Sequence, residues 1–292
     1  MSVIHSRRAM LFVPGNSQKM IDKIPSLAPG SFILDLEDSV PPMEKERARQ
    51  MVGDFIRSAR SDYELHVRIN DVSSPYALDD LAAVIDENLS GIVVPKVEHP
   101  DDLRRVDAVI DEFARLEGID VGHVGVTATI ETAAGLHRVY EIARVEGHLQ
   151  RLGFGSGDFA LDLGLDWPDA QGTPAILLWA KCQLVLASRI AGLEQPHDGS
   201  YTNYRDAEGL IREARESRRL GFGGKHVIHP SQITVVDEIF RPSEHQVQRA
   251  KRLIEAFEEA ERSGSGAVGV EGELIDYAIV YRSRRLIEEL DQ

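Results

Sequence analysis

The sequence has very little cysteine and no long hydrophobic segment. Its 292 residues include a single cysteine, Cys182, which excludes an intrachain disulfide. The longest apolar stretch, residues 175–186, is interrupted by polar side chains and is shorter than the roughly 20 residues that span a membrane. The opening MSVIHSRRAM also lacks the apolar run of a signal peptide. These absences predict a cytoplasmic protein that does not insert into membranes.

Positive charge is scarce as well. Lys+Arg 33 against Asp+Glu 48 leave a formal net charge of −15. A protein that binds the phosphate backbone of a nucleic acid needs clustered lysine and arginine, so we expect no nucleic-acid partner. The proportions of 42% hydrophobic and 28% charged residues are those of an ordinary globular protein, and the acidic balance is compatible with metal binding.

Short β-rich runs alternate with helical patterns over most of the chain. We expect eight strands, at residues 9–13, 31–35, 64–69, 91–94, 125–130, 151–155, 193–195 and 225–228. Helices are predicted at 43–59, 75–88, 100–116, 133–142, 174–190 and 206–220. Runs such as GIVVP are continuously apolar, as parallel strands covered by helices are. Eight strand–helix units favour a closed (β/α)8 barrel, the TIM barrel, over an open sheet.

The end of the chain departs from this pattern. We expect helices over residues 230–239, 242–261 and 275–290, with a flexible Ser-Gly-Ser-Gly break at 263–266. The chain is therefore divided into a catalytic barrel, residues 1–240, and a C-terminal helical extension, residues 241–292. This extension either packs beneath the barrel or crosses to a neighbouring subunit, where it could complete a site.

Two carboxylates follow neighbouring strands of the predicted barrel. The reacting groups of such barrels lie at the carboxyl ends of the strands, and Glu131 and Asp158 follow the fifth and sixth. Two carboxylates at one rim repel each other unless a cation lies between them. Mg²⁺ fits, because it takes oxygen ligands and leaves positions to water and substrate. The ten histidines lack H-E-x-x-H spacing and a lone cysteine excludes a thiolate cluster.

Other charged residues follow the second, third and fourth strands. Arg68 stands in an otherwise apolar strand, Asp35, Glu37 and Asp38 end the strand before it, and Lys96 ends the strand after it. Two interpretations of Arg68 are open: a structural ion pair with Asp35 or Glu37, or a fork that holds a carboxylate or stabilises an oxyanion. Lys96 is expected to neutralise the acidic rim from behind the reacting groups. Asp35 or Asp38 alone is as readily a loop acid or a helix cap.

Two further features suggest little chemistry. The glycine-rich run at residues 153–157 resembles a nucleotide-binding loop loosely, but the third glycine is not at the proper offset. Cys182 lies in an apolar helical segment, where core packing is expected.

Taken together, the strand ends resemble the citrate lyase β-subunit-like family of the HpcH/HpaI aldolases, which includes malyl-CoA and citramalyl-CoA lyases. The resemblance is carried by RRAMLFVPGN (7–16), ILDLEDSVPPMEK (33–45), HVRIN (66–70), VVPK (93–96), ATIET (128–132), GSGDFALDLG (155–164), RDAEGL (205–210) and GFGGKHVIHPSQI (221–233). It implies a Mg²⁺-dependent barrel that cleaves or forms a carbon–carbon bond beside a thioester carbonyl. Its partners would be an acyl-CoA thioester and a small keto acid.

The resemblance also implies roles for individual residues. Glu131 and Asp158 match the metal-binding carboxylates, and Arg68 matches a substrate arginine that acts in catalysis. Glu131 would also contact the substrate, and the turn of Phe12, Val13, Pro14 and Gly15 matches a segment near the CoA entrance. Asp276 matches an acid/base that relatives supply from a neighbouring subunit, which implies a homo-oligomer, a trimer or a hexamer.

Two departures from the family pattern bear on these roles. Relatives commonly have an acid at the position of Gly157, so the charge near the metal differs here. Relatives often have another residue and then proline after the tail aspartate, whereas Tyr277 and Ala278 follow Asp276. An aspartate at that place is also a common helix cap.

Several functions remain open at the level of the sequence. A pyruvate-type class II aldolase would keep the barrel and metal without CoA, and a malyl-CoA-type thioesterase would release free CoA. The chain could also be a lyase subunit whose substrate rides on an acyl carrier protein, or a metabolite-binding barrel without activity. The choice among malyl, citramalyl, methylmalyl and 3-hydroxy-3-methylglutaryl thioesters depends on pocket shape.

Overall fold

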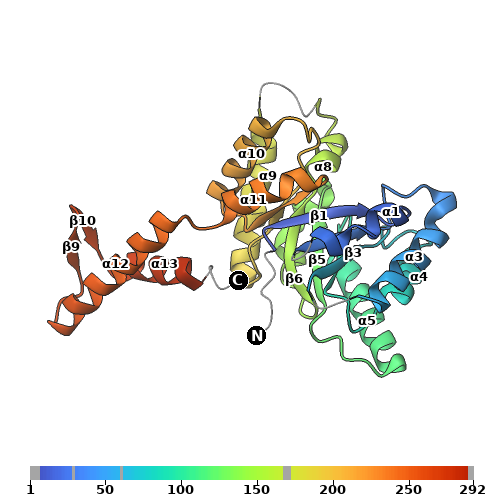
Figure 1. Ribbon diagram of the computed structural model, residues 1–292, viewed down its shortest axis with the longest axis horizontal. Coiled ribbons are helices and arrows are strands. Elements are labelled where there is room, and N and C mark those ends of the chain that lie inside the picture. The colour runs from blue at the N-terminus through green and yellow to red at the C-terminus, as the bar shows by residue number, and fades with distance from the viewer. Residues whose placement is uncertain (1–6, 28–29, 60–61, 167–171, 289–292) are drawn as a thin grey trace. The chain divides into compact units, whose positions relative to one another are not determined.

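Eight parallel strands form a closed barrel in chain order (Figure 1). The computed structural model describes residues 7–27, 30–59, 62–166 and 172–288. The barrel strands are β1 (Ala9–Pro14), β2 (Ser31–Asp35), β3 (Glu64–Arg68), β4 (Gly91–Val94), β5 (Gly125–Ile130), β6 (Leu149–Phe154), β7 (His197–Asp198) and β8 (Gly224–Val227). Each strand pairs with the next and β8 pairs with β1. The predicted (β/α)8 barrel is thus confirmed.

Helices cover the outside of the barrel. They are α1 (Gln18–Ile21), α2 (Ile24–Leu27), α3 (Lys45–Arg57), α4 (Ala77–Val84), α5 (Pro100–Glu117), α6 (Ala133–His137), α7 (Val139–Ile142), α8 (Ser156–Asp162), α9 (Ala175–Ala191), α10 (Ala207–Leu220) and α11 (Ile233–Phe240), with short 3₁₀ turns at Pro42–Glu44 and Pro230–Gln232. In α3, for example, Ala48, Val52 and Ile56 recur every four residues and are fully buried. Every residue of β2, β4 and β5 is buried, as expected for strands inside a helical layer.

The seventh strand lies later in the chain than predicted. We expected it at residues 193–195, but β7 is the pair His197–Asp198. The earlier residues complete the end of α9, because Gly192 takes a left-handed φ of 76° and the backbone N–H of Leu193 donates to the carbonyl of Ser188. Pro196 then offers no backbone N–H to a strand ladder.

Two other segments differ from the sequence prediction. The helix expected over residues 133–142 is divided at Arg138 into α6 and α7. The last helix, α13 (Tyr277–Glu288), is preceded by an unpredicted hairpin of β9 (Val268–Val270) and β10 (Glu273–Ile275). Its turn residues Glu271 and Gly272 have φ values of 51° and 86°, as a tight two-residue hairpin turn requires.

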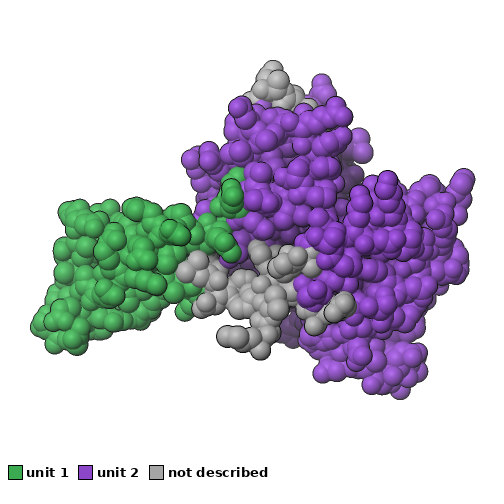
Figure 2. Space-filling model, viewed as in Figure 1, with its two compact units in different colours: residues 1–4, 238–292 green, residues 5–237 purple. Residues whose placement is uncertain are grey.

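The chain forms two compact units, which Figure 2 shows in different colours. The first is residues 5–237, which contains the barrel. The second consists mainly of residues 238–292. Within the second unit, α12 (Glu244–Arg262) and α13 pack with the hairpin around a small core of Leu253, Phe257, Ile275 and Val280. No helix among the described residues is long and apolar enough to cross a membrane.

Candidate active site

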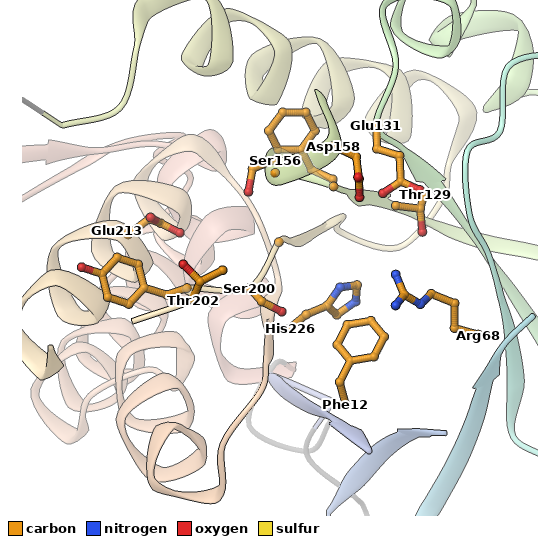
Figure 3. A pocket seen from close by; sticks show the side chains of 15 residues that line it. Phe12, Arg68, Thr129, Glu131, Ser156, Asp158, Ser200, Thr202, Glu213 and His226 are labelled. Atoms are coloured by element: carbon orange, nitrogen blue, oxygen red, sulfur yellow. The ribbon is translucent and has the colours of Figure 1, made fainter. Parts of the chain in front are cut away.

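A cavity of about 200 Å³ opens where the barrel strands reach their carboxyl ends (Figure 3). Its walls come from the ends of β3, β5, β6 and β7 and from side chains that point inward from β1 and β8. The described residues that line it are Phe12, Arg68, Thr129, Glu131, Phe154, Gly155, Ser156, Gly157, Asp158, Gly199, Ser200, Tyr201, Thr202, Glu213 and His226. This is the end of the barrel at which reacting groups are expected.

Glu131 and Asp158 direct their carboxylates toward the same part of this cavity (Figure 3). Glu131 directly follows β5 and is 3% exposed, and Asp158 lies in the first turn of α8 after β6. The Oε1 atom of Glu131 accepts a hydrogen bond of 2.8 Å from the backbone N–H of Lys96. Its Oε2 atom and both oxygens of Asp158 accept none from the residues that the structure describes. The pair therefore keeps three carboxylate oxygens available to a ligand.

The surroundings of Glu131 disfavour its charge when no cation is present. Burial raises the pKa of this carboxyl, and the negative charges of Glu37 and Asp158 raise it further, to about 8. A bound cation would reverse this effect by stabilising the ionised form.

Gly155 leaves room for the Glu131 side chain. A Cβ atom at position 155 would lie 2.0 Å from Glu131 Oε2, a distance at which one of the two groups must move. The glycine between β6 and α8 therefore fits the site by having no side chain, and residues 154–157 of the glycine-rich run line this cavity.

The donor set suits Mg²⁺. Among the described residues, no group of three or more acidic, histidine or cysteine side chains is placed to hold a metal ion. Glu131 and Asp158 are two carboxylates in one cavity, and Mg²⁺ is commonly bound by one or two carboxylates with water and substrate oxygens in the remaining positions. The oxygens of Glu131 and Asp158 without hydrogen-bond donors are the observation that supports this fit.

Arg68 is both a structural ion-pair partner and a wall of the cavity. Its Nε and Nη2 atoms donate to the two carboxylate oxygens of Asp35 at 2.7 and 2.8 Å, and Nη1 lies 3.1 Å from Glu37 Oε2. Its Cζ atom lies 4.8 Å from the centre of the Phe12 ring. Burial alone would lower the pKa of Arg68, but Asp35 raises it above its usual value. The charge in this apolar strand thus has a structural partner, as one of the two interpretations predicted.

Asp35, Glu37 and Asp38 gather around Arg68. Burial would raise the pKa of Asp35, but its hydrogen bonds with Arg68 outweigh burial and hold the pKa below its ordinary value. Asp38 Oδ2 lies 3.4 Å from Arg68 Nη1. Lys96 contributes in two ways, because its Nζ atom pairs with Glu37 while its backbone N–H reaches Glu131. It takes a left-handed φ of 47°, which is uncommon for a residue other than glycine.

The predicted CoA-entrance turn is divided between two environments. Phe12 lines the cavity, whereas Pro14 and Gly15 are not among the described residues that do so. The backbone N–H of Gly15 donates to the Asp35 carbonyl at 2.8 Å, and a Cβ atom there would lie 2.6 Å from that oxygen. The structure thus gives Gly15 a packing role against β2.

Asp276 lies in the second unit and caps its last helix. Its exposed side chain accepts a hydrogen bond of 3.1 Å from the backbone N–H of Ile279, at the start of α13. The alternative of a helix cap is therefore realised within the chain, and an acid/base role of Asp276 in a neighbouring subunit stays a prediction. Cys182, expected in the core, is half-buried on α9.

Several cavity residues were not anticipated from the sequence. Thr129 precedes Glu131 by two positions on β5, and His226 points inward from β8. The two-residue spacing of Thr129 from Glu131 is a signal that could have found Thr129. The others are Phe154, Ser156, Gly199, Ser200, Tyr201, Thr202 and Glu213.

The fold and the site together define a (β/α)8-barrel enzyme with an acidic, metal-compatible centre. The chain belongs to the HpcH/HpaI aldolase/citrate lyase family, whose model matches residues 8–230, and it is a carbon–carbon lyase. It is 34% identical to the citrate lyase subunit beta of Haemophilus influenzae, over 97% of this chain and 96% of that protein. It is 32% identical to an L-malyl-CoA/beta-methylmalyl-CoA lyase of Cereibacter sphaeroides, over 97% and 94%.

A solved structure of similar fold contains relevant ligands. The protein CitE from Mycobacterium tuberculosis, in complex with magnesium, acetoacetate and coenzyme A, matches with a TM-score of 0.78 and 26% identity. The match covers 98% of each chain.

Proposed function

We propose that this protein is a Mg²⁺-dependent lyase that cleaves a 3-hydroxyacyl-CoA thioester into acetyl-CoA, or a similar acyl-CoA, and a keto acid, or joins them in reverse. The observation that carries the proposal is the pair of carboxylates, Glu131 and Asp158, with open oxygens beside Arg68 in one cavity. Relatives named for malyl-CoA cleavage and a similar structure that holds magnesium and coenzyme A support it.

The reaction needs a base for the hydroxyl proton, a Lewis acid for the oxygens of the keto acid and a stabiliser for the thioester enolate. A base removes the proton of the 3-hydroxyl group, the bond between carbons 2 and 3 breaks, and its electron pair moves into the thioester as an enolate. The new carbonyl is released as the keto acid, and a proton on carbon 2 completes the acyl-CoA. Mg²⁺ held by Glu131 and Asp158 would polarise the oxygens of the keto acid.

Arg68 is suited to stabilise the enolate. Asp35 holds one edge of the guanidinium through two hydrogen bonds, which fixes its orientation before a substrate arrives. Hydrogen-bond donors on Nη1 and Nη2 remain for an oxyanion in the cavity. Such preorganised donors stabilise developing charge without reorganisation during the reaction.

The proton of the hydroxyl group needs a base, for which we propose Asp276 of a neighbouring subunit. The second unit would then act as a lid in a homo-oligomer, a trimer or a hexamer. The cap hydrogen bond uses Oδ1 of Asp276, and no described residue donates to Oδ2. That oxygen is available to accept a proton.

Product analysis tests the proposal. The purified protein is incubated with Mg²⁺ and malyl-, citramalyl-, methylmalyl- or 3-hydroxy-3-methylglutaryl-CoA, and acyl-CoA, free CoA and keto acid are quantified. We expect acyl-CoA and keto acid in equal amounts from at least one thioester. Release of free CoA with the hydroxy acid intact would indicate a thioesterase, and cleavage of free hydroxy-keto acids alone would indicate an aldolase without CoA.

A further inference from the structure

Strand β6 and the residue that follows it contribute no side chain at two successive positions that face into the barrel. Arg151 points inward and contacts Met10 and His197, so alternation also places Gly153 and Gly155 inward, each one pleat nearer the cavity. The space above Gly155 is occupied by Glu131. The space above Gly153 has no such occupant and forms a recess below the acidic pair.

Thr129 and His226 line this recess. A methyl group built on Gly153 would lie 3.4 Å from Thr127 Cγ2, 3.6 Å from Thr129 Oγ1 and 3.6 Å from His226 Cε1, so Thr127 also bounds the recess. These are ordinary van der Waals distances, so the recess is large enough for one small group among these three side chains.

Both side chains have polar atoms without partners. Thr129 is 7% exposed and His226 is 4% exposed, and Thr129 Oγ1 and His226 Nε2 form no hydrogen bond with the described residues. A buried donor or acceptor without a partner destabilises the protein, because it has lost its hydrogen bonds to water without replacing them. A bound group that supplies a hydrogen bond to each would remove this cost.

The recess is also uncharged. Burial, together with the positive charge of Lys225, lowers the pKa of His226 to about 3, so the imidazole is neutral at physiological pH. Among the described residues that line the cavity, Arg68 is the only cation, and it already pairs with Asp35, Glu37 and Asp38. Arg151, the inward cation one pleat below Gly153, pairs with Glu194, so a carboxylate that entered the recess would meet only cations that already have carboxylate partners.

We propose that this recess is the subsite for the third substituent of the keto acid, and that it selects a short, uncharged, hydrogen-bonding group over one that ends in a carboxylate. The inference rests on the proposed function, in which the keto acid contacts the metal through its carboxylate and carbonyl oxygens. Thr129 lies on β5 and Glu131 directly follows that strand, so their Cα atoms are roughly 6.6 Å apart along extended backbone. A substituent one carbon and one oxygen long therefore extends from the metal site to Thr129 and His226.

The experiment is calorimetric titration of the full-length protein, with Mg²⁺ present, using glyoxylate, pyruvate, hydroxypyruvate and oxaloacetate. These acids share the keto-acid head and differ in the third substituent. For the unaltered protein we expect hydroxypyruvate to bind at least about tenfold more tightly than oxaloacetate, because its hydroxyl group can hydrogen-bond to Thr129 and His226. A tenfold difference in affinity corresponds to about 1.4 kcal/mol. Equal or tighter binding of oxaloacetate would overturn the proposal.

Two matched pairs of variants locate the effect. Gly153→Ala fills the recess without a clash and should weaken pyruvate and hydroxypyruvate about tenfold while glyoxylate changes less than about threefold. Gly122→Ala, in the exposed loop before β5, controls for the substitution itself. Thr129→Val should weaken hydroxypyruvate about tenfold and spare pyruvate, whereas Thr129→Ser should keep the preference.

The outcomes separate the subsite from the proposed function. If Gly153→Ala and Thr129→Val weaken keto-acid binding selectively but the protein cleaves no thioester, the subsite is retained and the lyase function is refuted. Thioester cleavage with binding that is unchanged, or weakened equally for all four acids, would retain the lyase and refute the subsite. If Gly153→Ala does not fold, the two Thr129 variants decide. No binding of any keto acid also refutes the subsite.

Discussion

Arg68 is oriented by its partners before any substrate binds. Asp35 accepts from two of its nitrogens, Glu37 and Asp38 lie close to a third, and the Phe12 ring packs against the guanidinium plane. The planar fork is what allows Arg68 to bind Asp35 on one edge and present donors to the cavity on the other. A lysine at this position would retain charge without that geometry.

We therefore predict that Arg68→Lys lowers kcat about 10²–10³-fold, the effect of losing one well-placed electrostatic stabiliser. Steady-state kinetics at a temperature below the unfolding transition of the variant checks this, because the loss of the pair with Asp35 also lowers stability. Arg104→Lys, an exposed arginine on α5, is the matched control. A kcat for Arg68→Lys within about threefold of the unaltered protein would show that the fork is only structural.

Glu64, the first residue of β3, makes the free energy of unfolding depend on pH. Burial alone would raise its pKa, but interactions with His66 and Arg7 outweigh burial and lower it to about 2. Arg7 Nε donates to both carboxylate oxygens of Glu64, at 3.0 and 2.8 Å. Since the unfolded chain has a pKa near 4.5, this stabilisation is complete above that pH and is lost as the pH falls toward 2.

We predict that Glu64→Gln reduces the free energy of unfolding at pH 7 by roughly 2–3 kcal/mol and flattens its decline between pH 5 and about 2. Urea unfolding at a series of pH values measures both effects. Glu112→Gln breaks an exposed pair with Arg115 and should change neither. Parallel pH profiles for Glu64→Gln and the unaltered protein would contradict the assignment.

Helices and strands with a regular apolar pattern were predicted from the sequence, whereas the shortest strands were misplaced or missed. Apolar runs such as that of β4 are distinctive because every residue is buried. Strand β7 has only two residues, too few for any periodicity, and its position follows from the end of α9 at Gly192. The hairpin of β9 and β10 depends on left-handed backbone at Glu271 and Gly272, which lie between two predicted helices in a segment for which no element was predicted.

Site residues were predictable from the sequence where charged side chains come directly after a strand. Glu131 and Asp158 were found because two adjacent strands end next to acids. Thr129 and His226 were missed because each lies within a buried strand, where a polar residue attracts no notice until the barrel closes. The choice between the two interpretations of Arg68 needed the register of β2 and β3, which pairs it with Asp35.

The junction of β6 and α8 gives a prediction about the metal. In Gly155→Ala the new methyl group would lie 2.0 Å from Glu131 Oε2, so the Glu131 carboxylate or the backbone at residue 155 must move. We expect Mg²⁺ affinity to fall at least about tenfold, in line with the 1–3 kcal/mol cost of overpacking. Titration calorimetry measures it, with Gly153→Ala as the control whose methyl group fits. Equal Mg²⁺ affinity in both variants would place the metal elsewhere.

In the whole molecule, the proposed active site combines the barrel unit of one subunit with the second compact unit of another subunit. The barrel unit holds the metal ligands and Arg68, while the second unit, with its own small core, carries Asp276. The acid/base is thus proposed to come from another copy of the chain.

Subunit mixing tests this arrangement. Asp276→Ala and Glu131→Gln should each be inactive as pure oligomers, yet a mixture under subunit exchange should regain some activity, because some pockets then contain both intact residues. The rate of keto-acid formation before and after mixing is the measurement. A monomer in solution, or no recovery when exchange is demonstrated by mass, would leave Asp276 as the cap of α13.

The most direct test of the account is the rate of keto-acid formation from the cleaved thioester with Mg²⁺ and with excess EDTA. We predict that EDTA abolishes turnover, that added Mg²⁺ restores it, and that Glu131→Gln and Asp158→Asn are inactive under both conditions while unfolding cooperatively. Turnover that continues undiminished in excess EDTA would contradict the proposal that these two carboxylates hold a catalytic metal.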